Sequence, residues 1–138
     1  MNIDKTPNFE DYTIVLFCPL VVEQQTACLM LDEIHDGVPE RSAGQTVLYT
    51  FGKIASYSVA IAGYPIGEVG IGVSGSMVSE ALRYFPNLEA GILVGIAAGI
   101  PSPKRDIRLG DVAVAVPNGD NPGLIGYDLH LYGFIHFR

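Results

Sequence analysis

The sequence has little charge, and positive charge is scarcer still. Charged residues make up 17% of its 138 residues, and 8 Lys and Arg stand against 15 Asp and Glu, for a net charge of −7. A nucleic-acid-binding surface needs clustered Lys and Arg to neutralise phosphates, so a nucleic-acid partner is not expected. The apolar fraction of 49% is enough for the core of one domain.

Cysteine is also scarce, and long hydrophobic runs are absent. Cys18 and Cys28 lie in apolar stretches, without the spacing of a metal site or the further cysteines of a disulfide framework. No apolar run reaches the roughly 18 residues that a membrane span requires, and residues 1–11 lack the features of a secretory signal. These absences predict a reduced, cytoplasmic protein without a bound metal or a membrane partner.

The apolar periodicity predicts an α/β fold. Residues 12–18 form a short apolar run typical of a strand buried on both faces, and residues 20–34 carry a helical stripe. The pattern further predicts strands over 46–54, 58–64, 91–96 and 111–116, a helix over 74–84 that stops before Pro86, and an extended piece over 124–129. This order implies a mixed, mostly parallel central sheet with helices on its faces.

Glu23 interrupts the apolar stripe of the first predicted helix. It stands three residues after Leu20 and four before Ala27, so a carboxylate lies on the face that should pack on the sheet. Its place just past the carboxyl end of a strand favours a partly desolvated acid or base at the mouth of a cleft. A glutamate in a first helical turn also complements the helix dipole, and the residues alone favour this simpler interpretation.

A glycine-rich segment follows the fourth predicted strand. Residues 91–101 are Gly-Ile-Leu-Val-Gly-Ile-Ala-Ala-Gly-Ile-Pro, and Leu-Gly-Asp at 109–111 precedes the next predicted strand. Small residues there leave room for a ligand at the carboxyl end of the strand. The two segments resemble the core signature of the purine and uridine phosphorylase family, whose members cleave the N-ribosidic bond of nucleosides. The similarity extends to such domains at the amino end of fungal receptor-like multidomain proteins.

The resemblance implies an architecture. It predicts a phosphorylase-like, three-layer αβα domain over residues 12–128, covering the first half of the family's domain and therefore truncated. Residues 1–11 would then be a flexible amino terminus, and residues 129–138 a divergent aromatic tail. Because the family's ribose-binding Met-Glu pair and its proton-donating aspartate belong to the second half, we expect little activity from this chain alone.

The resemblance also implies a site without a cofactor or metal. It places Glu23 where nucleosidases of the family carry a water-activating glutamate. The implied substrate-binding residues are Gly67, Gly95, Ile96 and Ala97. Residues 1–40 lack the arginine that phosphorylases tend to carry in the first loop, and Ile96 stands where relatives often have a serine or threonine for phosphate or ribose. Hydrolysis of a purine-type nucleoside is therefore favoured over phosphorolysis, and phosphate is a poor second ligand.

Two other functions stay open. The first is a non-catalytic nucleoside-sensing or scaffold module of a receptor-like protein, as a homo-oligomer or as part of a multidomain chain. The second is a dinucleotide-binding fragment, because residues 70–75 form a literal G-x-G-x-x-G. That motif should directly follow a strand, and residues 65–69 intervene here, so this alternative ranks last.

Two further polar residues have predicted structural roles. His35 is expected at the carboxyl end of the first helix, where a cation is favourable. Asp111 is expected to fix a turn through backbone hydrogen bonds rather than to take part in chemistry.

Overall fold

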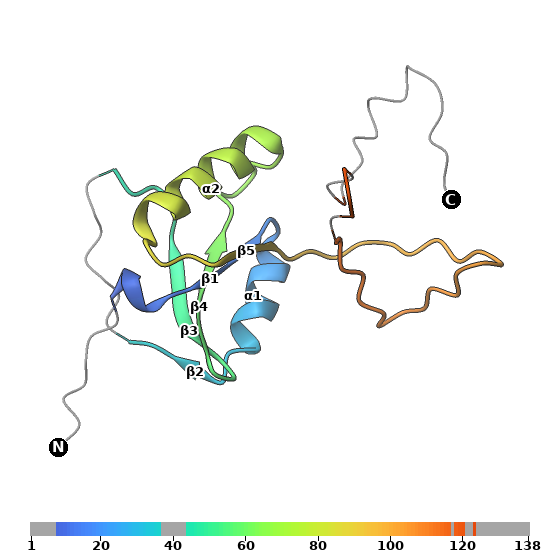
Figure 1. The fold of residues 1–138 in the computed structure, drawn as a ribbon, viewed down its shortest axis with the longest axis horizontal. Helices are drawn as coiled ribbons and strands as arrows, with labels where there is room; N and C mark the ends of the chain where they lie inside the picture. Colours follow the sequence, from blue (N-terminus) through green and yellow to red (C-terminus); the bar gives the residue numbers. More distant parts are fainter. Residues whose placement is uncertain (1–7, 37–43, 117, 121–122, 124–138) are drawn as a thin grey trace. The chain divides into compact units, whose positions relative to one another are not determined.

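The computed structural model describes residues 8–36, 44–116, 118–120 and 123, and the chain divides into two compact units, Met1–Ala97 and Ala98–Arg138. The elements of the first unit follow a 3-10 turn, Phe9–Asp11 (Figure 1). They are β1 (Ile14–Cys18), α1 (Val21–Leu29), β2 (Glu33–Ile34), β3 (Tyr49–Ile54), β4 (Tyr57–Gly63), α2 (Ile71–Tyr84) and β5 (Ala90–Leu93). The predicted α/β class is confirmed.

The five strands form one mixed sheet in the order β2-β3-β4-β1-β5. β1 pairs in parallel with β4 on one side and with β5 on the other. β3 pairs antiparallel with β4, and β2 antiparallel with β3. Because β4, β1 and β5 run in the same direction, their carboxyl ends meet at one edge of the sheet, where α/β proteins place their ligands.

The side chains of β1 alternate between two clusters. Val15 and Phe17 pack with residues of α2, whereas Leu16 and Cys18 pack with Ala27 of α1. Successive residues of a strand point to opposite faces, so the two helices cover opposite faces of the sheet (Figure 1). Burial on both faces explains why residues 12–18 are an almost continuous apolar run.

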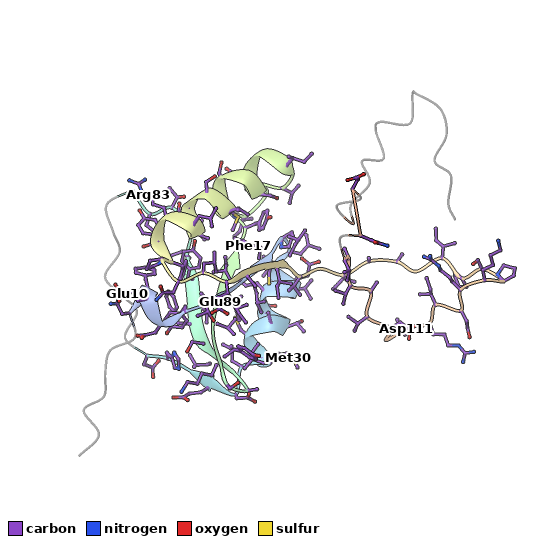
Figure 2. All side chains as sticks on the ribbon, in the orientation of Figure 1. Glu10, Phe17, Met30, Arg83, Glu89 and Asp111 are labelled. Carbon is purple, nitrogen blue, oxygen red and sulfur yellow. The ribbon has the colours of Figure 1, made fainter. Side chains whose placement is uncertain are left out.

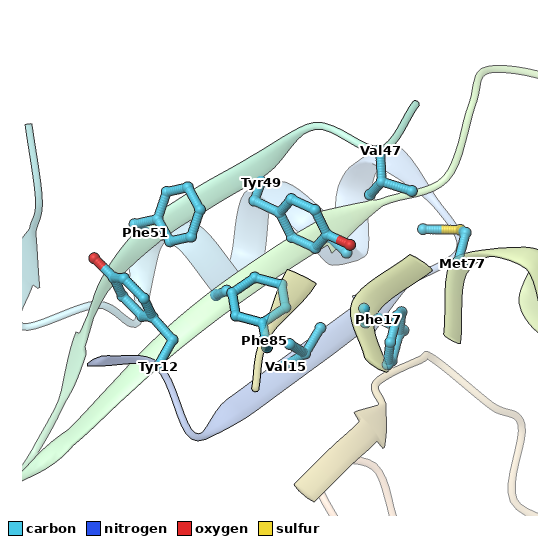
Figure 3. Close-up of a cluster of buried hydrophobic side chains, with 11 residues drawn as sticks. Tyr12, Val15, Phe17, Val47, Tyr49, Phe51, Met77 and Phe85 are labelled. Carbon is cyan, nitrogen blue, oxygen red and sulfur yellow. The ribbon is translucent and has the colours of Figure 1, made fainter. Parts of the chain in front are cut away.

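The α2 face holds an aromatic cluster centred on Phe85, which is 1% exposed (Figure 3). The centroid of its ring lies 5.1 Å from that of Tyr49, 5.2 Å from that of Phe9 and 6.3 Å from that of Phe51. Phe9 belongs to the 3-10 turn, within the terminus predicted to be flexible. The half-buried ring of Phe9 packs against the cluster, so this turn contacts the core of the folded unit.

The first helix is shorter than predicted. α1 ends at Leu29, and the segment after it pairs with β3, since Asp32 N–H donates to Lys53 O at 2.9 Å and His35 N–H to Phe51 O at 2.9 Å. The predicted helix through Ile34 is therefore wrong, because pairing with a neighbouring strand outweighs a short helical stripe. The predicted role of His35 at a helix end is wrong as well. Its Nδ1 shares a hydrogen bond of 2.7 Å with the hydroxyl of Tyr12.

The predicted strand over 111–116 is not formed. Three of its side chains, Val112, Val114 and Val116, are 87%, 75% and 68% exposed. A strand needs a neighbour to satisfy its backbone groups, and among the described residues no ladder includes this segment. The apolar composition of the segment predicted a strand, but it does not show whether a partner strand is available.

The predicted role of Asp111 is confirmed within the second unit. Arg108 N–H donates to Asp111 Oδ2 at 2.9 Å, and Asp111 N–H donates to Arg108 O at 3.1 Å. The aspartate therefore closes a turn through backbone hydrogen bonds. The extended piece predicted over 124–129 and the tail predicted over 129–138 lie outside the described residues.

Alkaline pH should destabilise the first unit through Tyr12. Burial, with a smaller contribution from the charge of Asp11, raises the pKa of Tyr12 from 10.0 to about 12. The folded state thus favours the neutral hydroxyl, and its stabilising contribution, fully present below pH 10, is lost as the pH rises from 10 to about 12. We expect urea unfolding to show a loss of about 3 kcal/mol from this group. Tyr12→Phe should flatten the decline, and an unchanged slope would contradict the assignment.

Candidate functional site

An open cavity of about 420 Å³ lies beside α1, on the α1 face of the sheet. It is lined by Leu16, Glu23, Thr26, Ala27, Met30, Ile54, Val94, Gly95 and Ile96. Met30, at the end of α1, is labelled in Figure 2. Among these described residues Glu23 is the single ionisable side chain, so the site is an apolar hollow with one carboxylate.

Glu23 is held in place by two backbone groups. It lies in the first turn of α1 and is 6% exposed. Its Oε2 accepts a hydrogen bond from Leu20 N–H at 2.7 Å, and its Oε1 accepts one from Ile96 N–H at 2.8 Å. The carboxylate therefore joins the start of α1 to the segment that follows β5. Its negative charge is also favourable at a helix amino terminus.

Gly95 allows this carboxylate to come close. A Cβ atom built on Gly95 would lie 3.2 Å from Glu23 Oε1. That is a tight contact for a side chain, so glycine suits a position where backbone and carboxylate must approach. The sequence singled out Gly95 for a close approach to a ligand, and the structure places a buried side chain of the protein itself there.

The structure brings together three of the five residues implied by the resemblance. Glu23, Gly95 and Ile96 all line the cavity. Gly67 lies in the loop after β4, where its φ of +81° suits glycine and a Cβ atom would meet nothing within 4 Å. Ala97 is exposed and, like Gly67, is not among the lining residues.

Two lining residues of the first helical segment were not singled out from the sequence. Thr26 and Met30 lie three and seven residues after Glu23, so the three side chains share one face of the helix. That spacing was visible in the sequence. Residues at helical spacing from Glu23 therefore identify this face as a wall of the site once Glu23 is placed in it.

The glycine motif at 70–75 opens α2. Gly70 is the N-cap residue, with a φ of +110° that favours glycine, and Gly72 and Gly75 lie inside the helix. α2 therefore begins three residues earlier than predicted. Residues 64–69 separate β4 from the motif, which leaves the tight strand-to-helix turn of a dinucleotide site unformed.

Cys18 lies at the end of β1 and is fully buried. Burial raises the pKa of its thiol to about 11, and the charges of Glu23 and Cys28 add to the effect. A thiol with this pKa stays protonated at neutral pH and is a poor nucleophile. Glu23 is therefore the candidate for acid–base chemistry among the described residues of the cavity wall.

Metal-binding clusters and membrane-spanning helices are both absent from the described residues. No group of three or more His, Cys, Asp or Glu side chains in that part of the chain could hold a metal ion. None of its helices is long and apolar enough to cross a bilayer.

The fold and the site define a mixed α/β domain with one buried carboxylate at the carboxyl edge of its sheet. The chain is 36% identical over 121 residues to a protein of the fungus Hyaloscypha variabilis named "Nucleotide-binding leucine-rich repeat (NLR)-like protein". The match covers 87% of this chain and 12% of that protein, so the chain corresponds to a small part of its relative. This finding agrees with the expected similarity to fungal receptor-like multidomain proteins.

No family model matches the chain. No solved structure matches it either. The relationship to the NLR-like protein therefore rests on sequence identity, and the membership of the nucleoside phosphorylase family stays a prediction.

Proposed function

We propose that this chain is a nucleoside-binding module of a receptor-like multidomain protein, built on the three-layer αβα architecture of nucleoside phosphorylases. The observation that carries the proposal is the buried carboxylate of Glu23, fixed beside an apolar cavity at the carboxyl ends of the parallel strands. Sites of α/β proteins lie at this edge, and an apolar hollow with few polar groups is typical of small-molecule pockets.

The chemistry of the cavity suits a purine-type nucleoside. A purine offers two apolar faces to side chains such as Leu16, Met30 and Val94, and ribose offers hydroxyl donors. Each oxygen of Glu23 accepts one backbone hydrogen bond and has a further lone pair for a hydroxyl group. A volume of about 420 Å³ lies within the range of small-molecule sites.

The relative supports the receptor-like context. Its name describes a leucine-rich-repeat protein of the NLR-like kind, and this chain matches a segment of it. A module in such a protein could report a bound nucleoside to other parts of the chain without cleaving it. Sensing through Glu23 is therefore the function that we place first.

Hydrolysis of the N-ribosidic bond is the second candidate, favoured over phosphorolysis by the absence of arginine from the first loop. The position of Glu23 beside Gly95 supports it, since a carboxylate there could orient a water molecule. Cleavage also needs an acid to protonate the departing base, and Glu23 is the single ionisable group among the described residues of the cavity wall. Binding therefore ranks above catalysis.

Calorimetry and liquid chromatography test the two candidates. We expect adenosine or inosine to bind the 138-residue chain, with little or no release of the free base. Glu23→Gln should weaken binding by at least about tenfold, because a charged acceptor is lost. Glu33→Gln, on an exposed side chain of β2, removes the same charge away from the cavity and is the matched control.

The outcomes separate the candidates. Base release that is abolished by Glu23→Gln would place hydrolysis first. A chain that binds neither nucleoside would refute both.

A further inference from the structure

Ser102 opens an exposed turn in the second unit. Its N–H donates to Arg105 O at 2.9 Å, and Arg105 N–H donates to Ser102 O at 3.0 Å, so Pro103 and Lys104 stand at the tip of the turn. All four residues are exposed. Proline suits the second position of a turn because its ring already fixes φ. The Ser102 hydroxyl therefore belongs to a surface segment that two backbone hydrogen bonds close.

The serines of α2 have a different environment. The hydroxyls of Ser74, Ser76 and Ser79 donate to backbone carbonyl oxygens one helical turn earlier. An enzyme that modifies one of them must first unfold part of the helix that packs on the sheet. Opening the turn at Ser102 costs only two hydrogen bonds between exposed residues, and such segments open at low free energy. Ser102 is therefore the more accessible hydroxyl.

The residues after Ser102 form a pattern that a protein kinase can recognise. Pro103 follows the serine directly, and Arg105 stands three residues after it. An apolar kinase pocket accepts proline at the first of these positions, because proline has no N–H that would be left unpaired. A kinase carboxylate or phosphate group can pair with a cation at the third. Thr6 is also followed by proline, but Phe9 stands at its third position, so the pattern favours Ser102.

Cationic side chains gather beside this serine in a chain that is otherwise acidic. Lys104, Arg105 and Arg108 are three of the 8 Lys and Arg residues in a sequence of net charge −7. Arg108 Nη2 lies 2.6 Å from Asp106 Oδ2, in an ion pair whose side chains are 77% and 67% exposed. An exposed pair of this kind contributes little, so the guanidinium can turn to a more highly charged anion. The cluster suits a phosphate group on the neighbouring serine.

We propose that Ser102 is a phosphorylation site for a protein kinase that selects proline at the next position and a cation at the third. The Ser102 oxygen attacks the γ-phosphorus of ATP, the bond from that phosphorus to the bridging oxygen of ADP breaks, and the hydroxyl proton passes to a carboxylate of the kinase. The phosphate adds a charge of about −1.5 to −2. It thereby reverses the sign of residues 102–111, which carry three cations and two carboxylates. Nucleoside binding is not required for this modification.

The test incubates the 138-residue chain with ATP and a purified cyclin-dependent kinase, an enzyme with this preference, and locates the phosphate by tandem mass spectrometry. We expect a phosphate on Ser102. Ser102→Ala should abolish incorporation, whereas Thr6→Ala and Ser79→Ala should leave it unchanged. Incorporation that survives Ser102→Ala, or no incorporation into the wild-type chain, would overturn the proposal.

Arg105→Ala separates selection by the kinase from exposure of the turn. It keeps Ser102, Pro103 and the backbone hydrogen bonds, and it removes the cation at the third position. We expect kcat/KM for phosphorylation to fall at least about tenfold. Arg108→Ala removes a cation beyond that position, and this control should change kcat/KM less than about twofold. Equal values for Arg105→Ala and the wild-type chain would refute the proposed selection.

Discussion

Replacing Phe85 with alanine should lower the free energy of unfolding of the first unit by about 3 to 5 kcal/mol. The ring is 1% exposed and packs against Tyr49, Phe9 and Phe51, so its removal leaves a cavity that these neighbours cannot fill. A small domain has a total stability of about 5 to 15 kcal/mol, and the variant should therefore be largely unfolded at moderate urea concentrations.

Leu82→Ala is the matched control for Phe85→Ala. Leu82 lies on α2, three residues before Phe85, and is 65% exposed, so its truncation removes few contacts. We expect a change of about 0.5 kcal/mol or less. Similar losses in the two variants, measured by urea denaturation, would show that the aromatic cluster does not hold α2 on the sheet.

Replacing Glu23 with alanine should cost about 3 kcal/mol of unfolding free energy, because the carboxylate satisfies two backbone donors. A hydrogen bond to a charged group contributes about 1.5 to 3 kcal/mol. Without the carboxylate, the N–H groups of Leu20 and Ile96 lose their acceptor, and α1 is no longer joined to the segment after β5. Urea unfolding followed by circular dichroism measures the loss.

Glu23→Gln is an intermediate variant in the same experiment. It keeps one acceptor oxygen for two donors, so its loss should be about half that of Glu23→Ala. A loss below about 0.5 kcal/mol in Glu23→Ala would mean that water replaces the carboxylate without cost. The two hydrogen bonds would then matter for ligand binding alone.

The sequence revealed the parts of the fold that have a local periodic signal. The apolar run at 12–18 and the apolar segment at 58–64 predicted strands that the structure contains, and Pro86 correctly predicted the end of α2. β2 was missed, because a strand of two residues carries no period of its own and forms through its pairing with β3.

The candidate site was predictable in part for the same reason. The carboxylate of Glu23 on an apolar helical stripe is a local anomaly, and it is indeed buried. Its contact with Ile96 depends on a strand pairing far along the chain, which no local pattern encodes. The strand predicted at 111–116 is the opposite case. Its local pattern is clear, but no partner strand pairs with it among the described residues, and the strand is not formed.

The hydrogen bond between Glu23 and Ile96 also bears on the order of folding. The two residues are 73 positions apart, and closing so long a loop costs chain entropy before any contact repays it. β5 pairs with β1, and the β3–β4 hairpin and α2 lie between these two strands in the sequence. The pairing therefore closes a long loop. Until then the carboxylate at the start of α1 stays hydrated. We therefore expect the desolvation of this charge to coincide with the final closure of the sheet, so that the pocket acquires its walls and its electrostatic character in a single late step.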